Sequence, residues 1–349
     1  MRFIGFGAVC LAGLLSSTGV GWAAGIAPTP ITPELIQKAT AEGKVVMYTS
    51  VEPDLIQGLG KVFEGKYPGI SVQIERTGSE RVFQRISQEY AANIHTVDVV
   101  NSSDAAHFIY WRAHGMLAPF VSPEMVEQYP DTAIEPDGTY ASWRVTLSPI
   151  AYNTQLVKDA NAPKSFKDLL DPKWKGNLVK ASPNYSGTIM TSTYESLQHL
   201  GGWSYFESLA NQDVLQMQSA LEPTRKIASG EREVAVDGSE YFMYALIDKG
   251  NPIKIVYPSE GVPMITSPAA ILKEAPHPNA ARLFYAFLFS QPVQQIMVDK
   301  GGTRSLHKQV KDPPSHVPLS AIKIWPEDAA AVETHSDEIK KRYRDLFGG

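Results

Sequence analysis

Cysteine is almost absent from this chain of 349 residues. The only one, Cys10, lies within the first 24 residues, which we interpret as a removable leader. The mature chain would then contain no cysteine, which excludes a disulfide framework and any metal site built on thiolates. Its stability must come from a sizeable hydrophobic core.

The chain also lacks a hydrophobic run long enough to cross a membrane, which takes roughly 20 apolar residues. The apolar stretch at residues 3–15 is short and is interrupted by glycines. One cation, Arg2, precedes it, and small residues ending in Ala23 and Ala24 follow it. This layout is typical of a signal peptide, so we expect export to the periplasm with cleavage near Ala23 or Ala24. The alternative is an uncleaved anchor helix.

Basic clusters and catalytic signatures are missing as well. The formal net charge is −5, and no group of lysines and arginines is dense enough to indicate nucleic-acid binding. The chain has no G-x-S-x-G elbow, no H-E-x-x-H motif and no Walker A loop. We expect His95, His107 and His277 to lie away from any reactive serine, and we see no zinc-binding pattern around His107 and His114. The sequence therefore argues against an enzyme and predicts neither a resident metal nor a cofactor.

One local pattern recurs through the chain: a short apolar strand ends in small hydroxyl residues that open a helix. Helix N-termini present unpaired N–H groups and a partial positive charge. In an open α/β sheet these ends gather at the carboxyl edge of the strands, where ligands bind. The pattern therefore predicts a solute-binding cleft. It occurs at residues 47–50, 75–79, 100–103, 184–188 and 236–239.

Strands and helices alternate along most of the chain, which predicts an α/β fold with parallel layers. Apolar strands are expected at residues 44–48, 70–74 and 97–100, each followed by a segment with helical spacing of apolar residues. Residues 77–80, Thr-Gly-Ser-Glu, fit a capping box for the second of these helices. The extended segment 147–153 separates two stretches that each have this α/β pattern.

Several motifs follow one another in a fixed order: GKVVMYTSVEPD, VDVVNSSDA, AYNT, SFKDLLDPKWKGNLVKASP, SGT and APHPNAARLFYAFLFSQPVQQ. Together they resemble the extracellular solute-binding proteins of bacterial ABC importers, in the ferric-ion-binding-like branch. The resemblance covers about residues 43–308. Its most specific pieces are the LDPKWKG run at 170–176 and the HPNAA run at 277–281.

This resemblance implies a type II periplasmic binding fold, in which two α/β lobes joined by two crossing segments close on a ligand in the cleft. The ligand would stabilise the closed form by contacting both lobes, and an inner-membrane permease would recognise that form. We expect a monomer. The expected parts are a signal peptide at 1–24, lobe 1 at 42–146 plus 260–310, lobe 2 at 150–257, a C-terminal tail and helix at 311–349, and crossings near Ser148–Tyr152 and Val256–Pro263.

Ferric-binding members of this family hold iron with a histidine, a glutamate and two adjacent tyrosines. In this chain the resemblance puts Glu52 at the histidine position and Ser102 at the glutamate position. Tyr241 matches the first tyrosine, but Phe242 replaces the second. One phenolate and one carboxylate are few anionic oxygen ligands for a hard trivalent cation. Iron held by Glu52 and Tyr241 is therefore the alternative ligand, not the first choice.

The anion-holding side of the family site is better preserved. Ser186, Gly187 and Thr188 match the anion-holding turn, and Ser239 replaces an asparagine. These residues could also serve only as helix caps, and Glu80 could serve only in a capping box. Arg76 and Arg144 lie near the expected cleft and remain open as anion ligands. The ligand-binding residues that we expect are Ser50, Glu52, Ser79, Ser102, Ser103, Tyr152, Ser186, Gly187, Thr188, Asp237, Ser239 and Tyr241.

The sequence therefore predicts a periplasmic binding subunit of an ABC importer. Its ligand would be a small anionic or polar solute, such as a phosphate ester, a phosphonate or a carboxylate. The nearby acidic residues leave open a zwitterion whose amine they would hold, or a cation; they are Glu52, Asp104, Asp237 and Glu240. The alternatives are a ferric-iron-binding subunit, an exported α/β hydrolase, and a two-lobed sensor that signals to a membrane receptor.

Overall fold

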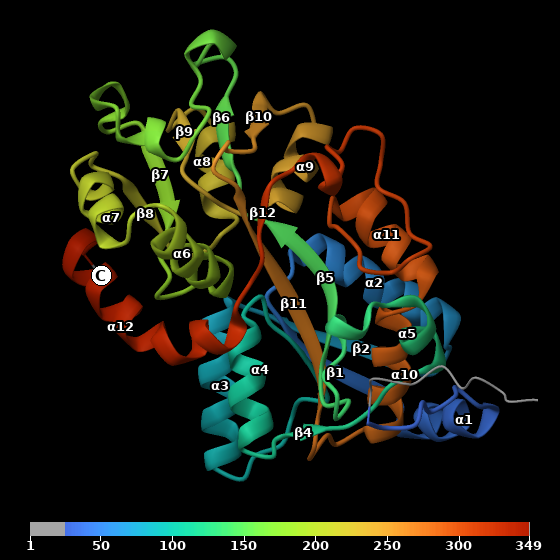
Figure 1. The fold of residues 1–349 in the computed structure, drawn as a ribbon. Coiled ribbons are helices and arrows are strands. Elements are labelled where there is room, and N and C mark those ends of the chain that lie inside the picture. Colours follow the sequence, from blue (N-terminus) through green and yellow to red (C-terminus); the bar gives the residue numbers. More distant parts are fainter. Residues whose placement is uncertain (1–24, 349) are drawn as a thin grey trace, which may run out of the picture.

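Two β-sheets, each covered by helices, make up residues 25–348, which are the residues described by this computed structural model (Figure 1). The expected signal peptide at residues 1–24, with Cys10, lies outside this range. Within it, no helix combines the length and the apolar character needed to span a membrane.

The first sheet has seven strands, in the spatial order β12-β11-β3-β1-β2, and β4 and β5 also pair with β11. Strand β1 runs parallel to β2 and β3, whereas β11 runs antiparallel to β3 and β5. The sheet is therefore mixed: β1, β2 and β3 have the parallel arrangement predicted from the alternation, and β11 departs from it. Its strands are β1 Lys44–Thr49, β2 Ser71–Arg76, β3 Val99–Asn101, β4 Leu117–Ala118, β5 Ala141–Leu147, β11 Val262–Leu272 and β12 Ile324–Trp325.

The second sheet has five strands in the order β10-β6-β9-β7-β8. Strand β7 is parallel to β8 and β9, while β6 is antiparallel to β9 and β10. Its strands are β6 Ile150–Asn153, β7 Leu178–Ala181, β8 Leu215–Met217, β9 Val234–Ala235 and β10 Ile253–Val256.

The helices divide between the two sheets, and we use "first lobe" and "second lobe" for each sheet with its helices. The first lobe has α1 Pro33–Glu42, α2 Pro53–Lys66, α3 Ser79–Ala91, α4 Ala105–Ala113, α5 Pro123–Gln128, α10 Pro278–Leu288 and α11 Gln291–Gly301. The second lobe has α6 Gly187–His199, α7 Trp203–Ala210, α8 Glu222–Ala228 and α9 Glu240–Asp248. Short 3-10 helices are η1 Asp131–Ala133, η2 Asp159–Asn161, η3 Lys167–Leu170, η4 Pro172–Trp174 and η5 Leu319–Ala321.

The chain passes between the lobes at residues 148–149, from β5 to β6, and at residues 257–261, from β10 to β11. The final helix, α12 Ala329–Phe347, contacts α4 of the first lobe and also α6 and α7 of the second. Figure 1 shows this helix lying along one side of both lobes. The lobe boundaries given from the sequence remain a proposal.

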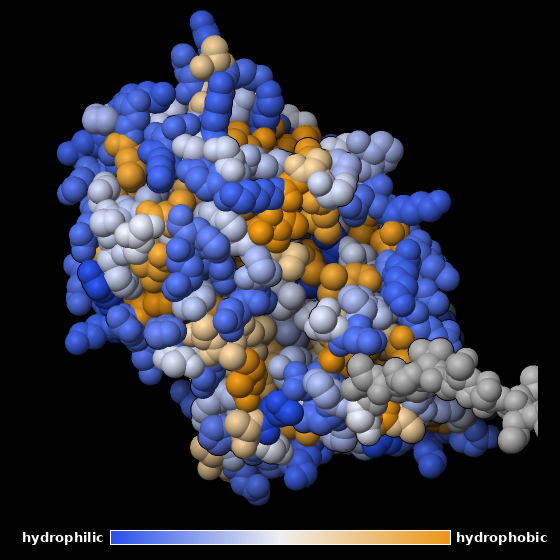
Figure 2. All heavy atoms as spheres, viewed as in Figure 1, coloured by the Kyte–Doolittle hydropathy of each residue, from blue (hydrophilic) through white to orange (hydrophobic). Residues whose placement is uncertain are grey.

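Each lobe has its own aromatic core. In the first lobe Phe63 of α2 meets Phe284 and Phe287 of α10 edge-on, with ring centroids 5.0 and 5.2 Å apart. In the second lobe the core includes Phe206 and also Tyr343 of α12, so the last helix belongs to that core. Figure 2 shows that hydrophilic residues cover most of one face of the molecule and that the hydrophobic ones form separate patches.

The capping box predicted at residues 77–80 is wrong. Helix α3 begins at Ser79 with Gly78 as its N-cap, and no side chain caps it. The carboxylate of Glu80 instead contacts Nζ of Lys340 at 3.0 Å and Nε2 of His107 at 3.5 Å. Burial acts to raise the pKa of Glu80, but its contacts with His107 and Lys340 lower the pKa to about 2. Glu80 therefore pairs with side chains of α4 and α12 instead of forming the local cap.

Candidate functional site

A small cavity lies where the two lobes meet, with a volume of about 20 Å³. The first lobe contributes the residues that follow β1, β2 and β3, and the second lobe those that follow β7, β8 and β9. The cavity is therefore at the edge where the strand-to-helix connections of both sheets converge. It is lined by Ser50, Arg76, Gly78, Ser79, Ser103, Arg144, Tyr185, Ser186, Thr188, Ser219, Ala220, Leu221, Ser239 and Tyr241.

Two helices of the second lobe begin at the cavity. Ser186 is the N-cap of α6 and Ser239 is the N-cap of α9, and neither side chain makes a capping hydrogen bond. Capping was the structural alternative to ligand binding for these serines, and the geometry does not support it. Both helix starts direct partial positive charge toward the cavity.

Arg144 of β5 is the strongest charge in the cavity. The residue is 2% exposed, and its Nε and Nη1 find no hydrogen-bond partner within residues 25–348. Its guanidinium carbon lies 5.2 Å from the ring centroid of Tyr241. Burial lowers the pKa of Arg144, yet a guanidinium stays protonated in proteins. A buried cation without a partner is costly, so this arginine fits an anion brought by a ligand.

Arg76 adds a second guanidinium at the end of β2. Its Nε donates to the carbonyl of Val51 at 3.1 Å, and its Nη2 donates to the carbonyl of Ser50 at 3.4 Å. These neutral partners orient the side chain without neutralising it. No aspartate or glutamate is among the residues that line the cavity. The cavity is therefore positively charged and rich in hydroxyl donors, an arrangement that suits a phosphate-like or carboxylate group.

The structure brings seven of the twelve expected ligand-binding residues into the cavity wall. They come from five different strand-to-helix connections, which are far apart in sequence. The seven are Ser50, Ser79, Ser103, Ser186, Thr188, Ser239 and Tyr241. Arg76 and Arg144, which the sequence left open, also line the cavity. The assignment of each as a ligand contact remains a proposal.

Three of the other expected residues are engaged in structural contacts away from the cavity wall. Tyr152 of β6 donates from its hydroxyl to Oδ1 of Asp159 at 2.6 Å, within the second lobe. Asp237 forms a buried ion pair with Nζ of Lys180 at 2.6 Å, and burial raises the pKa of Asp237. Glu52 caps α2, because its Oε2 accepts from N of Leu55 at 3.0 Å.

Gly187 lies between two cavity residues, but its backbone serves the contact between lobes. Its N–H donates to Oγ of Ser79 in the first lobe at 2.6 Å. A Cβ at this position would lie 2.3 Å from Cβ of Asp104, also in the first lobe. The resemblance placed this glycine in the anion-holding turn, as an expected ligand-binding residue. In the structure the close approach is between the two lobes.

Ser102 makes a contact that corrects a sequence expectation. Its Oγ lies 3.0 Å from Nδ1 of His107, so a histidine does meet one of the candidate serines. Nε2 of the same ring faces Glu80 at 3.5 Å and Asp104 at 3.6 Å. Ser102 is 0% exposed, and its Oγ also accepts from N of Asp104. These contacts therefore stabilise the turn between β3 and α4, and the Ser102 hydroxyl is not accessible to a substrate.

Five cavity residues were not among the expected ligand-binding residues, although Gly78 and Tyr185 lie within the recurring strand-to-helix pattern: Gly78, Tyr185, Ser219, Ala220 and Leu221. The last three follow β8, a three-residue strand whose residues are all half-buried, so its apolar pattern is weak. A local signal was nevertheless available. Ser219 and Glu222 fit the S-x-x-E form of a capping box, and Oε2 of Glu222 accepts from N of Ser219 at 2.9 Å.

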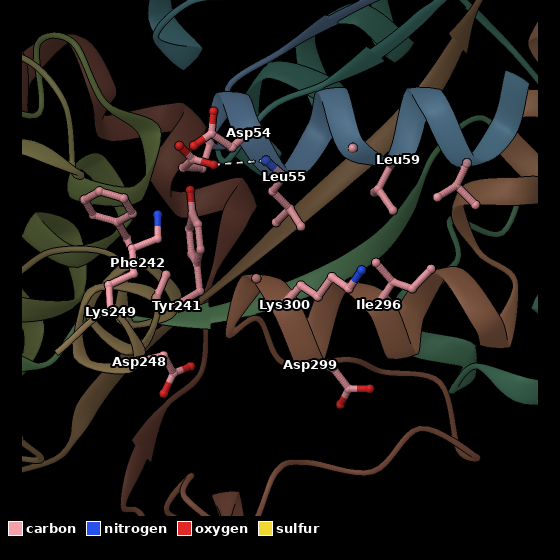
Figure 3. A pocket seen from close by; sticks show the side chains of 15 residues that line it. Asp54, Leu55, Leu59, Tyr241, Phe242, Asp248, Lys249, Ile296, Asp299 and Lys300 are labelled. Atoms are coloured by element: carbon pink, nitrogen blue, oxygen red, sulfur yellow. Dashed lines mark hydrogen bonds between the residues drawn. The ribbon is translucent and has the colours of Figure 1, made fainter. Parts of the chain in front are cut away.

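A larger groove adjoins the cavity, with a volume of about 450 Å³ (Figure 3). It lies between α2 and α11 of the first lobe and α9 of the second. Tyr241 lines both the cavity and the groove, and Glu52 lines the groove alone. Figure 3 shows the Tyr241 ring directed toward the start of α2, with Leu59 and Ile296 facing each other farther along.

Comparison with known proteins identifies relatives of this architecture. The family model for bacterial extracellular solute-binding proteins matches residues 95–333. An uncharacterized protein of Haemophilus influenzae is 28% identical over 275 residues, which cover 75% of this chain and 78% of that protein. Iron uptake protein A1 of Synechocystis is 24% identical over 303 residues, covering 81% and 79%.

Among solved structures, the periplasmic binding protein AfuA from Actinobacillus pleuropneumoniae, with fructose-6-phosphate bound, matches with a TM-score of 0.80. The alignment covers 87% of this chain and 98% of AfuA at 24% sequence identity. This likeness confirms the two-lobed α/β fold expected from the sequence. Together with the family match, it shows that the chain belongs to the bacterial extracellular solute-binding proteins, the binding components of ABC importers.

Proposed function

We propose that this protein captures a small organic phosphate or phosphonate in the cavity between its lobes and delivers it to an importer permease. The observation that supports this most directly is Arg144, whose buried Nε and Nη1 have no partner within the described chain. An oxyanion would accept hydrogen bonds from this guanidinium and neutralise it. Without such a ligand the buried charge only destabilises the protein.

Donors from both lobes can meet one anion in this cavity. The first lobe offers Arg76 and Arg144, and the second offers Ser186 and Ser239 at the starts of α6 and α9. A ligand that needs both sets is held fully only when the lobes are together. It would therefore shift the population toward the closed form.

The comparison with AfuA supports the same class, because that structure contains a sugar phosphate. Transfer of this chemistry to the present chain is our proposal. A carboxylate is the second member of the class, since it also accepts two hydrogen bonds from one guanidinium.

Ferric ion is the alternative solute, because Iron uptake protein A1 is among the relatives. Glu52 and Tyr241 both line the groove and would be the oxygen ligands. Two features oppose it. Phe242 cannot supply a second phenolate, and burial raises the pKa of Tyr241, which disfavours the phenolate that iron requires.

The remaining parts of the proposal concern transport. We propose a monomer that is exported by the leader at residues 1–24, cleaved near Ala23 or Ala24, and works in the periplasm. An inner-membrane permease would then accept the closed, loaded form. We propose no catalytic step, since the serine that meets a histidine, Ser102, is fully enclosed.

Isothermal titration of refolded, ligand-free protein tests the proposal. The titrants are inorganic phosphate, methylphosphonate, fructose-6-phosphate and ferric citrate. Arg144→Met should weaken binding of the anionic titrants at least tenfold, because a charge-assisted hydrogen bond contributes about 1.5–3 kcal/mol. Arg282→Met is the matched control, since Arg282 is exposed on α10 and the net charge changes equally.

The outcomes separate the two candidate solutes. Binding of any of the phosphorus compounds, with loss in Arg144→Met and retention in Arg282→Met, supports the anion assignment. Binding of ferric citrate alone, unaffected by Arg144→Met, would replace it with the iron assignment. If Arg144→Met binds phosphate and methylphosphonate as well as the unmodified protein does, the cavity is not the anion site.

A further inference from the structure

The cavity between the lobes is too small for the whole of an organic ligand. Its volume of about 20 Å³ accommodates little more than one or two water-sized groups. An oxyanion group can occupy such a space, but a substituent attached to it must extend beyond the wall. The direction in which it leaves decides which organic anions the protein can hold.

The groove described above begins at the cavity wall. Tyr241 lines both, and its ring centroid lies 5.2 Å from the guanidinium carbon of Arg144. The groove volume of about 450 Å³ is in the range of small-molecule sites. A substituent that passes Tyr241 would therefore enter a space large enough for a ring.

The groove walls are apolar and come from both lobes (Figure 3). Leu55 and Leu59 project from α2, and Ile296 projects from α11. Phe242 and Ala245 supply the facing wall from α9. Burial of apolar surface contributes roughly 25 cal/mol per Å², so a hydrocarbon group here would gain affinity and would also join α2 to α9.

The charged groups of the groove are of both signs, with an excess of acidic ones. Asp54, Asp248 and Asp299 are exposed at the rim with Lys249 and Lys300, and Glu52 is half-buried. Four carboxylates against two ammonium groups disfavour an anionic substituent. The interior contacts are with carbon, which favours an uncharged, apolar group.

We infer that this groove is the second subsite of the same ligand and that it holds an apolar substituent, aromatic or branched, carried by the anion. The inference rests on the proposed function, because the anion must first occupy the cavity. It narrows the solute class from organic anions in general to phosphonates or phosphate monoesters with a hydrophobic group. Such a ligand would be held at one end by Arg144 and at the other by α2 and α9.

Titration with two phosphonates that differ only in the substituent tests this inference. In the unmodified protein, phenylphosphonate should bind at least tenfold more tightly than methylphosphonate. Ala245→Trp fills the groove from α9 and should abolish that difference, because the phenyl group would lose its space. Ala210→Trp is the matched control, because Ala210 is also half-exposed on a helix of the second lobe and lies outside the groove.

Each result decides between the assignments. Equal affinity for the two phosphonates in the unmodified protein overturns the subsite but leaves the proposed function standing. A preference for phenylphosphonate that survives in Ala245→Trp shows that the substituent lies elsewhere and also overturns it. If neither phosphonate binds while inorganic phosphate or fructose-6-phosphate does, the subsite is overturned and the proposed function stands; if none of these phosphorus compounds binds, the proposed function itself fails. The comparison within the unmodified protein remains decisive even if Ala245→Trp does not fold.

Discussion

At the scale of single residues, the notable feature is a charge without a partner. Arg144 lies on the seven-residue strand β5, whose residues are all buried, and nothing acidic lines the cavity that it faces. Other buried cations in this protein have carboxylates, as Lys180 has Asp237 and Arg304 has Glu240. The contrast supports the proposed role of Arg144 in binding an anion, a role that would come at a cost in stability.

Arg144→Met should therefore stabilise the ligand-free protein. Replacing a buried, unpaired charge with an apolar side chain of similar length should add about 1–4 kcal/mol to the free energy of unfolding. Differential scanning calorimetry should show a rise in Tm of several degrees, whereas Arg282→Met should show little change. A fall in Tm for Arg144→Met would mean that the guanidinium is satisfied in the folded protein.

The sequence predicted the serines of the cavity better than its arginines. Ser186 and Ser239 lie in short connections between an apolar strand and a helix, so a local pattern indicates them. The role of Arg144 depends on the absence of acidic residues from the cavity wall in the folded protein. No local sequence pattern contains that information. Asp237 shows the converse, because the pattern marked it for a ligand while Lys180, distant in sequence, pairs with it.

At the scale of elements, helix starts in this protein are often capped from elsewhere in the fold. Helix α10 has His277 as its N-cap, but no side-chain capping bond. Instead Glu42, at the end of α1, accepts from N of Ala280 at 2.7 Å and from N of Asn279 at 3.0 Å. Element positions were predictable from periodicity to within a few residues, whereas such remote caps were not.

Glu42→Ala should destabilise the first lobe. Loss of an N-terminal cap typically costs about 0.5–2 kcal/mol, and two N–H groups lose their acceptor here. Urea unfolding followed by circular dichroism should show a lower midpoint with an unchanged slope. Glu127→Ala, at an exposed position on α5, provides the control. Equal midpoints for the two variants would show that water replaces the carboxylate as acceptor with no loss in the free energy of unfolding.

At the scale of the whole molecule, one carboxylate joins the lobes. Glu327 precedes α12; its Oε1 accepts from Oγ1 of Thr191 on α6 at 3.0 Å, and its Oε2 accepts from N of Thr266 on β11 at 2.9 Å. The residue is half-exposed, but its carboxylate is enclosed by these threonines. Burial, with the nearby charge of Asp104, raises the pKa of Glu327 to about 7.

This raised pKa makes stability depend on pH with a definite sign. The folded state keeps the Glu327 proton up to a pH of about 7, whereas the unfolded chain releases it near 4.5. The folded state thus binds more protons between these values, and the free energy of unfolding should fall as pH rises through that window. Glu327→Gln should remove this contribution, on the order of 3 kcal/mol at full extent.

Chemical denaturation of both proteins at pH 5 and pH 8 measures the effect. The two should be similar in stability at pH 5, and Glu327→Gln should be relatively more stable at pH 8. If the free energy of unfolding changes with pH in the same way for the unmodified protein and the variant, the Glu327 carboxylate has an ordinary pKa. The contact between the lobes would then not depend on pH.

Because no cysteine follows residue 24, a single cysteine introduced on helix α12 could be labelled selectively. Its Tyr343 is fixed in the core of the second lobe, while Lys340 meets Glu80 of the first lobe at 3.0 Å. Because residues 25–348 contain no thiol, Lys340→Cys would create a unique site for a fluorescent dye. A dye there would sense the separation of the lobes directly. The fluorescence of the labelled protein would then report ligand binding. A library of compounds could be screened with this signal for the solute that the protein binds.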